Sequence, residues 1–166
     1  MSDWLLVRPA VPADADALVE LGHEVAGEPE LWLTYERTRG DERRNVRSVQ
    51  RDSNVAVFVA ETTEGIVGRL SIARDRSPLS RHVAEFGLMV AARARRRGIG
   101  SALIEEAVKW ARGAGVVKLE LTVFPHNAPA IALYRKLGFR EEGLLRRRYF
   151  IDGRYIDAML MGRDLN

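Results

Sequence analysis

Three neighbouring arginines and two spaced glycines form the segment of this chain that is best suited to hold an anion. They are Arg95, Arg96, Arg97, Gly98 and Gly100, and they stand between an apolar run and an amphipathic run. Glycine lets the backbone approach a ligand closely, while the N-terminus of a helix offers unpaired N–H groups and a partial positive charge. Arginine adds fixed charge and forked donors. The spacing therefore predicts a cradle for a phosphate or pyrophosphate group.

Three other interpretations of this segment stay open on these residues alone. A dinucleotide-binding loop needs a third glycine where Leu103 stands, although Glu120 lies at a suitable distance downstream for a ribose contact. A nucleic-acid surface could use the arginines between positions 93 and 97, yet no aromatic residue interleaves with them. An ordinary strand–turn–helix connection would need no ligand at all.

Hydrophobic periodicity predicts the elements that must position these residues. Strands are expected over 3–8, 54–61, 66–74, 83–90 and 116–124, and two more flank the turn at Asp152-Gly153. Helices are expected from about Pro12, over 41–51, after Gly100, and from a loop at 125–127 to Leu137. The order β-α-α-β-β-β-α-β-α-β-β predicts a single α/β domain over residues 1–166, with a mixed sheet.

Composition limits the classes of protein to consider. The 166 residues are 46% hydrophobic and carry a formal net charge of +3, so the positive character is local, which favours a small phosphorylated ligand. Cysteine is absent, and His23, His82 and His126 match no metal-binding spacing, so we expect no metal. No apolar run is long enough to span a bilayer. These observations predict a cytoplasmic protein without a membrane or nucleic-acid partner.

Two motifs in the correct order resemble those of the GNAT superfamily of acyl-CoA-dependent N-acetyltransferases. Arg95-x-x-Gly98-x-Gly100 is similar to its pyrophosphate-binding signature, Gln/Arg-x-x-Gly-x-Gly/Ala. The segment from Asn127 to Phe139, NAPAIALYRKLGF, is similar to its second signature, N-x-x-A-x-x-L-Y-x-K-x-G-F. Residues 82–87 and 142–157 resemble the bacterial branch that acetylates amino acids, polyamines or protein N-termini.

The resemblance implies a GNAT fold whose splayed central sheet binds coenzyme A, and it suggests a homodimer. The strand before the arginines would offer its backbone to the pantetheine arm, and amides from Arg96 to Ser101 would hold the pyrophosphate. Asn127 would bond the pantetheine or cap the following helix, and Lys136 would lie near the nucleotide phosphates. The residues expected to bind acetyl-CoA are Leu88, Met89, Val90, Arg95, Arg96, Arg97, Gly98, Ile99, Gly100, Ser101, Asn127, Ala130 and Lys136.

Two residues are candidates for proton transfer. Glu85 shares a strand face with Gly87 and Met89, and the missing side chain at Gly87 leaves room for a ligand beside a carboxylate that could accept a proton. The alternatives are an exposed carboxylate without a role and a base at His82. Tyr134 matches the tyrosine that protonates or hydrogen-bonds the departing thiolate in the superfamily, and the alternative is a core aromatic.

The acceptor is expected to be a primary amine. Trp32 and Tyr35, between the first two helices, and Tyr149, in the last hairpin, fall where the superfamily lines its acceptor pocket beside the base, Glu85. The predicted activity is transfer of an acetyl group to an amino acid, a polyamine or a protein N-terminus by direct attack on the thioester. The alternatives are a regulatory module that binds acyl-CoA without turnover and a basic protein associated with nucleic acid.

Overall fold

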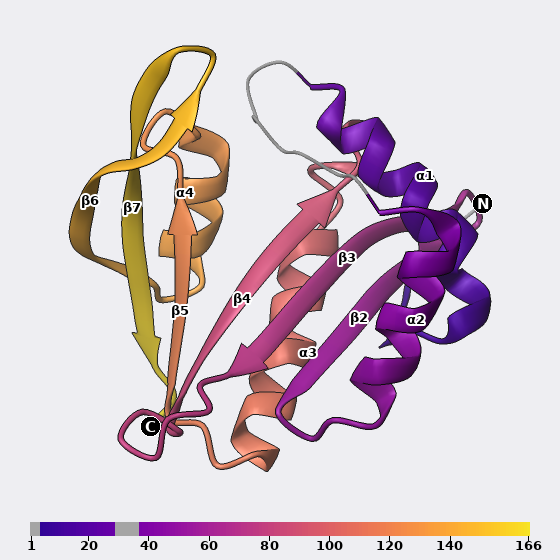
Figure 1. The fold of residues 1–166 in the computed structure, drawn as a ribbon, viewed down its shortest axis with the longest axis horizontal. Helices are drawn as coiled ribbons and strands as arrows, with labels where there is room; N and C mark the ends of the chain where they lie inside the picture. Colours follow the sequence, from indigo (N-terminus) through magenta and orange to yellow (C-terminus); the bar gives the residue numbers. More distant parts are fainter. Residues whose placement is uncertain (1–3, 29–36) are drawn as a thin grey trace.

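A computed structural model describes residues 4–28 and 37–166 as one mixed, seven-stranded sheet with helices on both faces (Figure 1). The strands run in the order β1-β2-β3-β4-β5-β7-β6. They are β1 (Leu6–Pro9), β2 (Val55–Thr62), β3 (Gly65–Arg74), β4 (Val83–Val90), β5 (Lys118–Val123), β6 (Arg140–Ile151) and β7 (Arg154–Asp164). The described helices are α1 (Ala15–Ala26), α2 (Arg39–Gln50), α3 (Ile99–Gly113), α4 (Ala128–Lys136) and two short 3-10 helices, η1 (Pro12–Asp14) and η2 (Ala92–Ala94).

The order of strands and helices confirms the fold class expected from the sequence, and most bounds move by one to three residues. The second helix begins at Arg39 because Thr38 and Asp41 form a capping box. The third begins at Ile99, since Gly98 takes a left-handed conformation and ends the preceding turn. No helix within residues 4–28 and 37–166 is long and apolar enough to cross a membrane.

The sheet divides at its centre. Strand β4 pairs with β3 along its whole length, but it pairs with the parallel strand β5 only at Val83, Ala84 and Glu85. Beyond Glu85 the two strands separate, as Figure 1 shows. Strand β5 is held on its other side by β7, with which it pairs antiparallel. This divergence confirms the splayed sheet that the sequence resemblance implied.

Each face of the sheet has its own apolar core. Helices α3 and α4 pack on one face, where Leu103 and Ile104 of α3 meet the buried side chains of β3, β4 and β5. Helices α1 and α2 cover β2, β3 and part of β4 on the other face, through Leu18 and Val46. The open part of the sheet therefore lies between α1 and α2 on one side and the β6–β7 hairpin on the other (Figure 1).

Gly68 of β3 sets how closely α3 approaches the sheet. A Cβ atom at this position would lie 3.0 Å from Cδ1 of Leu103 and 3.2 Å from Cγ2 of Ile99. We predict that Gly68→Ala lowers the free energy of unfolding by about 1–3 kcal/mol, because overpacking a tight core forces side chains off their rotamers. Gly87→Ala is the matched control, since a Cβ there meets nothing within 4 Å. Urea unfolding of both variants tests this, and equal stabilities would contradict it.

Candidate active site

The gap between β4 and β5 leaves one backbone edge of β4 without a strand partner. The hydrogen bonds Ala91 N to Val67 O and Asp75 N to Val83 O show that odd-numbered residues of β4 face β3. Even-numbered residues beyond Glu85 therefore turn their N–H and C=O groups to the gap. The free edge therefore consists of the carbonyl of Phe86, both peptide groups of Leu88 and the N–H of Val90, because the last pair with β5 uses the N–H of Phe86 and Nε of Arg95 donates to the carbonyl of Val90.

This register corrects one expectation about the backbone of β4. Leu88 and Val90 offer their peptide groups to the gap as expected, but the peptide groups of Met89 face Arg69 of β3. The side chain of Met89 packs near Leu21 and Val25 of α1 instead. Phe86, which the sequence analysis did not select, contributes its carbonyl to the free edge.

The segment after β4 presents unpaired backbone donors at the start of α3. The first helical hydrogen bond runs from Ala102 N to Gly98 O, and among the described residues the N–H groups of Gly98, Ile99, Gly100 and Ser101 donate to no other group. Gly98 has φ +76° and an open position for a Cβ atom. These donors and the helix dipole make a fitting cradle for a pyrophosphate group.

Gly100 serves a different purpose from Gly98. It lies inside α3, where a Cβ atom would stand 3.0 Å from Cδ2 of Leu133 in α4 and 3.5 Å from Cδ2 of Leu88. Its missing side chain therefore lets α4 approach the start of α3. Sequence reasoning assigned both glycines to ligand approach, and the structure adds a packing role for Gly100, whose N–H remains among the donors of the cradle.

The three arginines before Gly98 have distinct surroundings. Arg95 forms a bidentate ion pair with Glu28 at 2.7 and 2.6 Å, and its Nε donates to the carbonyl of Val90 at 3.1 Å. Arg97 contacts Glu64 at 3.4 Å. Arg96 is exposed, has φ +62°, and forms no ion pair within the described parts of the chain. A strained backbone at an exposed, unpaired arginine indicates a functional position, so Arg96 is the best placed of the three to meet a phosphate.

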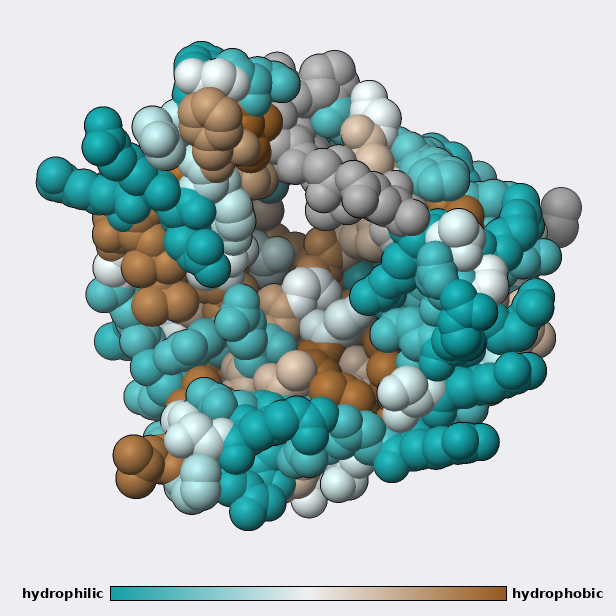
Figure 2. Space-filling model, in the orientation of Figure 1, coloured by the Kyte–Doolittle hydropathy of each residue, from teal (hydrophilic) through white to brown (hydrophobic). Residues whose placement is uncertain are grey.

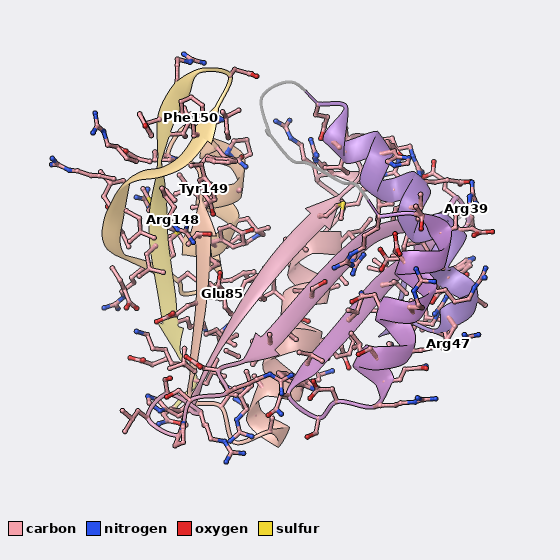
Figure 3. All side chains as sticks on the ribbon, in the orientation of Figure 1. Arg39, Arg47, Glu85, Arg148, Tyr149 and Phe150 are labelled. Atoms are coloured by element: carbon pink, nitrogen blue, oxygen red, sulfur yellow. The ribbon has the colours of Figure 1, made fainter. Side chains whose placement is uncertain are left out.

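Glu85 lies at the point where the sheet divides (Figure 3). It occupies the last register pair between β4 and β5, opposite Glu120, and its side chain is exposed on the face that also carries Gly87. A Cβ atom at Gly87 would meet nothing within 4 Å, so the space beside Glu85 is open. Glu120 does not stand free for a ribose, because it pairs with Lys118 at 3.2 Å.

Tyr134 of α4 lies behind the gap. Its side chain is 8% exposed and packs edge-on against Phe86 and Phe139, with ring centroids 6.1 and 6.0 Å away. Burial raises the pKa of the phenol to about 12, so the group stays protonated at neutral pH. Its hydroxyl has no hydrogen-bond partner among the described residues, and none of their fully buried polar side-chain atoms lacks one. The hydroxyl therefore reaches accessible space, where it can donate.

The other residues expected at the cofactor site lie on or next to α4. Asn127 caps this helix, because its side-chain oxygen accepts from Ala130 N at 3.4 Å. Ala130 is half-buried against the core, and Lys136 is exposed near the C-terminal end of the helix. The capping role expected for Asn127 is confirmed.

Aromatic side chains gather at the far end of β5. The ring of Tyr149 lies 5.6 Å from that of Phe124, which stacks on His126, also at 5.6 Å. The sequence analysis selected Tyr149 but missed Phe124, because its run of apolar neighbours suggested a strand interior. Figure 3 places Tyr149 on the β6–β7 hairpin, on the other side of the gap from α1 and α2. Trp32 and Tyr35 lie outside the described residues.

The face between the hairpin and α1–α2 is hollowed at its centre (Figure 2). A polar cluster that the sequence analysis also missed lies on this face of β3: Arg69 with Ser71 beside it and Glu42 of α2 above it. Within residues 4–28 and 37–166, no group of three His, Asp or Glu side chains is arranged to hold a metal ion.

Comparison with known proteins agrees with this geometry. A model of the acetyltransferase (GNAT) family matches residues 20–139. The chain belongs to this family. It is 32% identical over 164 residues to the L-amino acid N-acetyltransferase AaaT of Escherichia coli, covering 96% of this chain and 97% of that protein.

Solved structures of GNAT proteins share the fold. A GNAT acetyltransferase from Streptococcus pneumoniae superimposes with a TM-score of 0.89 at 32% identity, over 97% of this chain and 99% of that one. A phosphinothricin acetyltransferase from Sinorhizobium meliloti, solved with acetyl-CoA, has a TM-score of 0.84 at 24% identity, over 98% and 89% of the two chains.

The burial of Tyr134 generates a prediction about alkaline stability. An unfolded tyrosine has a pKa of about 10, whereas the pKa in the folded protein is about 12. Between these values the unfolded state has lost its proton and the folded state keeps it, so the free energy of unfolding should fall by about 1.4 kcal/mol per pH unit. Urea unfolding between pH 9 and 11 should show a shallower fall in Tyr134→Phe. Parallel slopes in the two proteins would contradict the buried, protonated phenol.

Proposed function

We propose that the protein transfers the acetyl group of acetyl-CoA to the primary amine of an amino acid, a polyamine or a protein N-terminus by direct attack on the thioester. The observation that carries this proposal is the divergence of β4 from β5 directly after Glu85. It puts a carboxylate, a free strand edge and the donors at the start of α3 at one opening. Membership of the acetyltransferase family supports the reaction class.

Each part of the opening has a task in binding acetyl-CoA. The free edge of β4 pairs with the pantetheine arm, whose amides need the same partners as a strand. The donors of Gly98 to Ser101 and the guanidinium of Arg96 hold the pyrophosphate. Arg95 fixes the end of β4 through its bond to the Val90 carbonyl. Leu88, between Phe86 and Val90, then offers its N–H and C=O groups to the pantetheine arm.

The transfer itself needs a neutral amine and a stabilised leaving group. A lysine-like amine, with a pKa near 10.4, costs roughly 4–5 kcal/mol to deprotonate at pH 7, and an α-amine near 7.7–8.0 costs only about 1–1.5 kcal/mol. Glu85 accepts this proton, directly or through water, as the new C–N bond forms. The C–S bond breaks, and Tyr134 donates its proton or a hydrogen bond to the thiolate.

The runner-up is a module that binds acyl-CoA without catalysing transfer. Replacement of Tyr134 distinguishes the two, because Tyr134→Phe should lower turnover in the enzyme and leave acyl-CoA binding unchanged in either case. The name of the Escherichia coli relative supports an amino-acid acceptor among the three classes. The cytoplasmic location and the homodimer stay predictions.

Release of coenzyme A across a panel of L-amino acids, polyamines, aminoglycosides and N-terminal peptides tests the proposed function. We expect amine-dependent release with at least one class, and the acetylated amine as its product. Acetyl-CoA that raises the melting temperature without amine-dependent release would instead establish the binding module.

Arg96 provides a test of the cradle. Arg96→Gln should raise the Kd of acetyl-CoA about 10–100-fold, because one charge-assisted contact to a phosphate is lost. The stability of the free protein should not change, since Arg96 is exposed and forms no ion pair with the described residues. Arg43→Gln, an exposed arginine on α2, is the matched control. Titration calorimetry measures both, and equal Kd values would contradict the assignment.

Glu85 provides a test of the base. Glu85→Gln keeps the size of the side chain and removes the proton acceptor. The loss in kcat/KM should be largest where the amine is mostly protonated, and it should shrink as the pH approaches the pKa of the amine. Rate profiles from pH 6 to 10 measure this. A profile parallel to that of the wild type at every pH would mean that the base lies elsewhere, with His82 the next candidate.

A further inference from the structure

A buried ion pair joins α2 to β3 on the face that carries Glu85. Nη1 of Arg69 lies 3.0 Å from Oε1 of Glu42, and the two side chains are 7% and 0% exposed. Asn45 donates to the same Glu42 oxygen at 3.3 Å, and Arg37 approaches Glu42 at 3.4 Å. The Arg37 side chain is 46% exposed, so it links this buried pair to solvent.

The guanidinium of Arg69 has one nitrogen, Nη2, whose two N–H groups are not used by the described residues. Its Nε donates to Oγ of Ser71 at 3.2 Å, and its Nη1 is taken by Glu42. Nη2 forms no hydrogen bond with residues 4–28 or 37–166. None of the fully buried polar side-chain atoms in residues 4–28 and 37–166 is without a partner, so Nη2 must reach accessible space. A nearly buried arginine therefore presents the N–H groups of Nη2 to accessible space on the same face of β3 as Ser71.

The register of the sheet places this donor close to the reaction centre. Arg69 pairs with Met89, Ser71 with Gly87, and Ala73 with Glu85. Because the Nε atom of Arg69 bonds Ser71, its guanidinium leans along β3 toward the level of Gly87, where a Cβ would meet nothing. At about 3.3 Å per residue, Gly87 stands roughly 6.6 Å along the strand from Glu85. A small molecule can span that distance.

A purely structural role explains this cluster poorly. A buried ion pair costs desolvation free energy, and apolar residues of similar volume often replace it without loss of stability. The positions on either side of Arg69 are apolar, since Val59 is its partner on β2 and Met89 its partner on β4. Among the described residues of this cluster, Arg37 and Arg69 carry two positive charges against the one negative charge of Glu42, which favours an anion.

We propose that Arg69, assisted by Arg37, binds the carboxylate of the acceptor, and that the acceptor is an α-amino acid whose amine faces Glu85. Glu42 is a positioning residue that holds the Arg69 guanidinium with its Nη2 toward the hollow. The same positive charge disfavours polyamines, which carry no carboxylate. This inference rests on the proposed acetyl transfer and selects one acceptor class for it.

The test compares each L-amino acid with its own carboxamide, because the amide lacks only the anionic group. Arg69→Met combined with Glu42→Gln removes both buried charges together, so neither is left unpaired. Arg37→Gln removes the exposed arginine alone, and Arg43→Gln is the control on α2. The measured quantity is the ratio of kcat/KM for the acid to that for the amide at one pH. The pKa of each amine cancels when variants are compared.

We expect the acid-to-amide ratio to fall about 10–100-fold in the double variant and about 10-fold in Arg37→Gln. Turnover of the amides and the melting-temperature shift with acetyl-CoA should persist in both. An unchanged ratio, with only a lower melting temperature, would show that the cluster is structural and overturn the inference. Wild-type turnover of polyamines or peptides in preference to amino acids would overturn it as well. Absence of turnover with every amine would instead overturn the proposed function.

Discussion

The separation of β4 from β5 after Glu85 is the constraint on which the rest of this structure depends. Strand β4 is fixed to β3 as far as Val90, whereas β5 is fixed to β7, so each half of the sheet follows its own partner. Three aromatic rings, those of Phe86, Tyr134 and Phe139, pack edge to face directly behind the point of separation. Their bulk stabilises the open arrangement, which closer strands could not accommodate.

Two consequences follow from this single opening. Beyond the last pair with β5, the even-numbered peptide groups of β4 have no strand partner. An unpaired peptide group costs free energy in a dry interior, so a ligand with its own amides can stabilise these groups by pairing with them. After β4 the chain turns through residues 91–98 into α3, and the first N–H groups of α3 lie at the end of the same edge. A backbone edge and an anion cradle thus follow each other along one continuous segment, which suits a long ligand with a phosphate-bearing end.

The sequence predicted those features that depend on local patterns. Strand 83–90, the left-handed Gly98 and the cap at Asn127 follow from side-chain alternation, from a glycine before a helix and from an amide at a helix start. The features that depend on contacts between residues far apart in the sequence were not predicted. The close approach of Leu133 in α4 is the reason for a glycine at position 100. The hydrogen bond from Ala91 N to Val67 O shows which peptide groups of β4 face β3 and which face the gap.

The charged residues show the same limit. Arg95, Arg96 and Arg97 are equivalent in the sequence, whereas in the structure Arg95 pairs with Glu28, 67 residues away, and Arg97 contacts Glu64, 33 residues away. A single arginine at position 69 in an otherwise apolar run was the one available signal of the polar cluster, and its carboxylate partner lies 27 residues earlier in α2. Such a pair becomes visible only when the helix is placed on the strand.

The two residues proposed for proton transfer, Tyr134 and Glu85, differ in their burial. On the side of α3 and α4, the apolar packing around Tyr134 raises the pKa of its phenol to about 12, so the phenol keeps its proton. On the other face, Glu85 is exposed at the end of its pairing with β5, where water can stabilise its charge and carry protons away. Desolvation disfavours the phenolate, so the neutral hydroxyl of Tyr134 suits donation of a hydrogen bond to the leaving thiolate better than complete transfer of its proton. The exposed position of Glu85 suits the proton acceptor that we propose, and the sheet separates it from the hydrogen-bond donor that we propose at Tyr134.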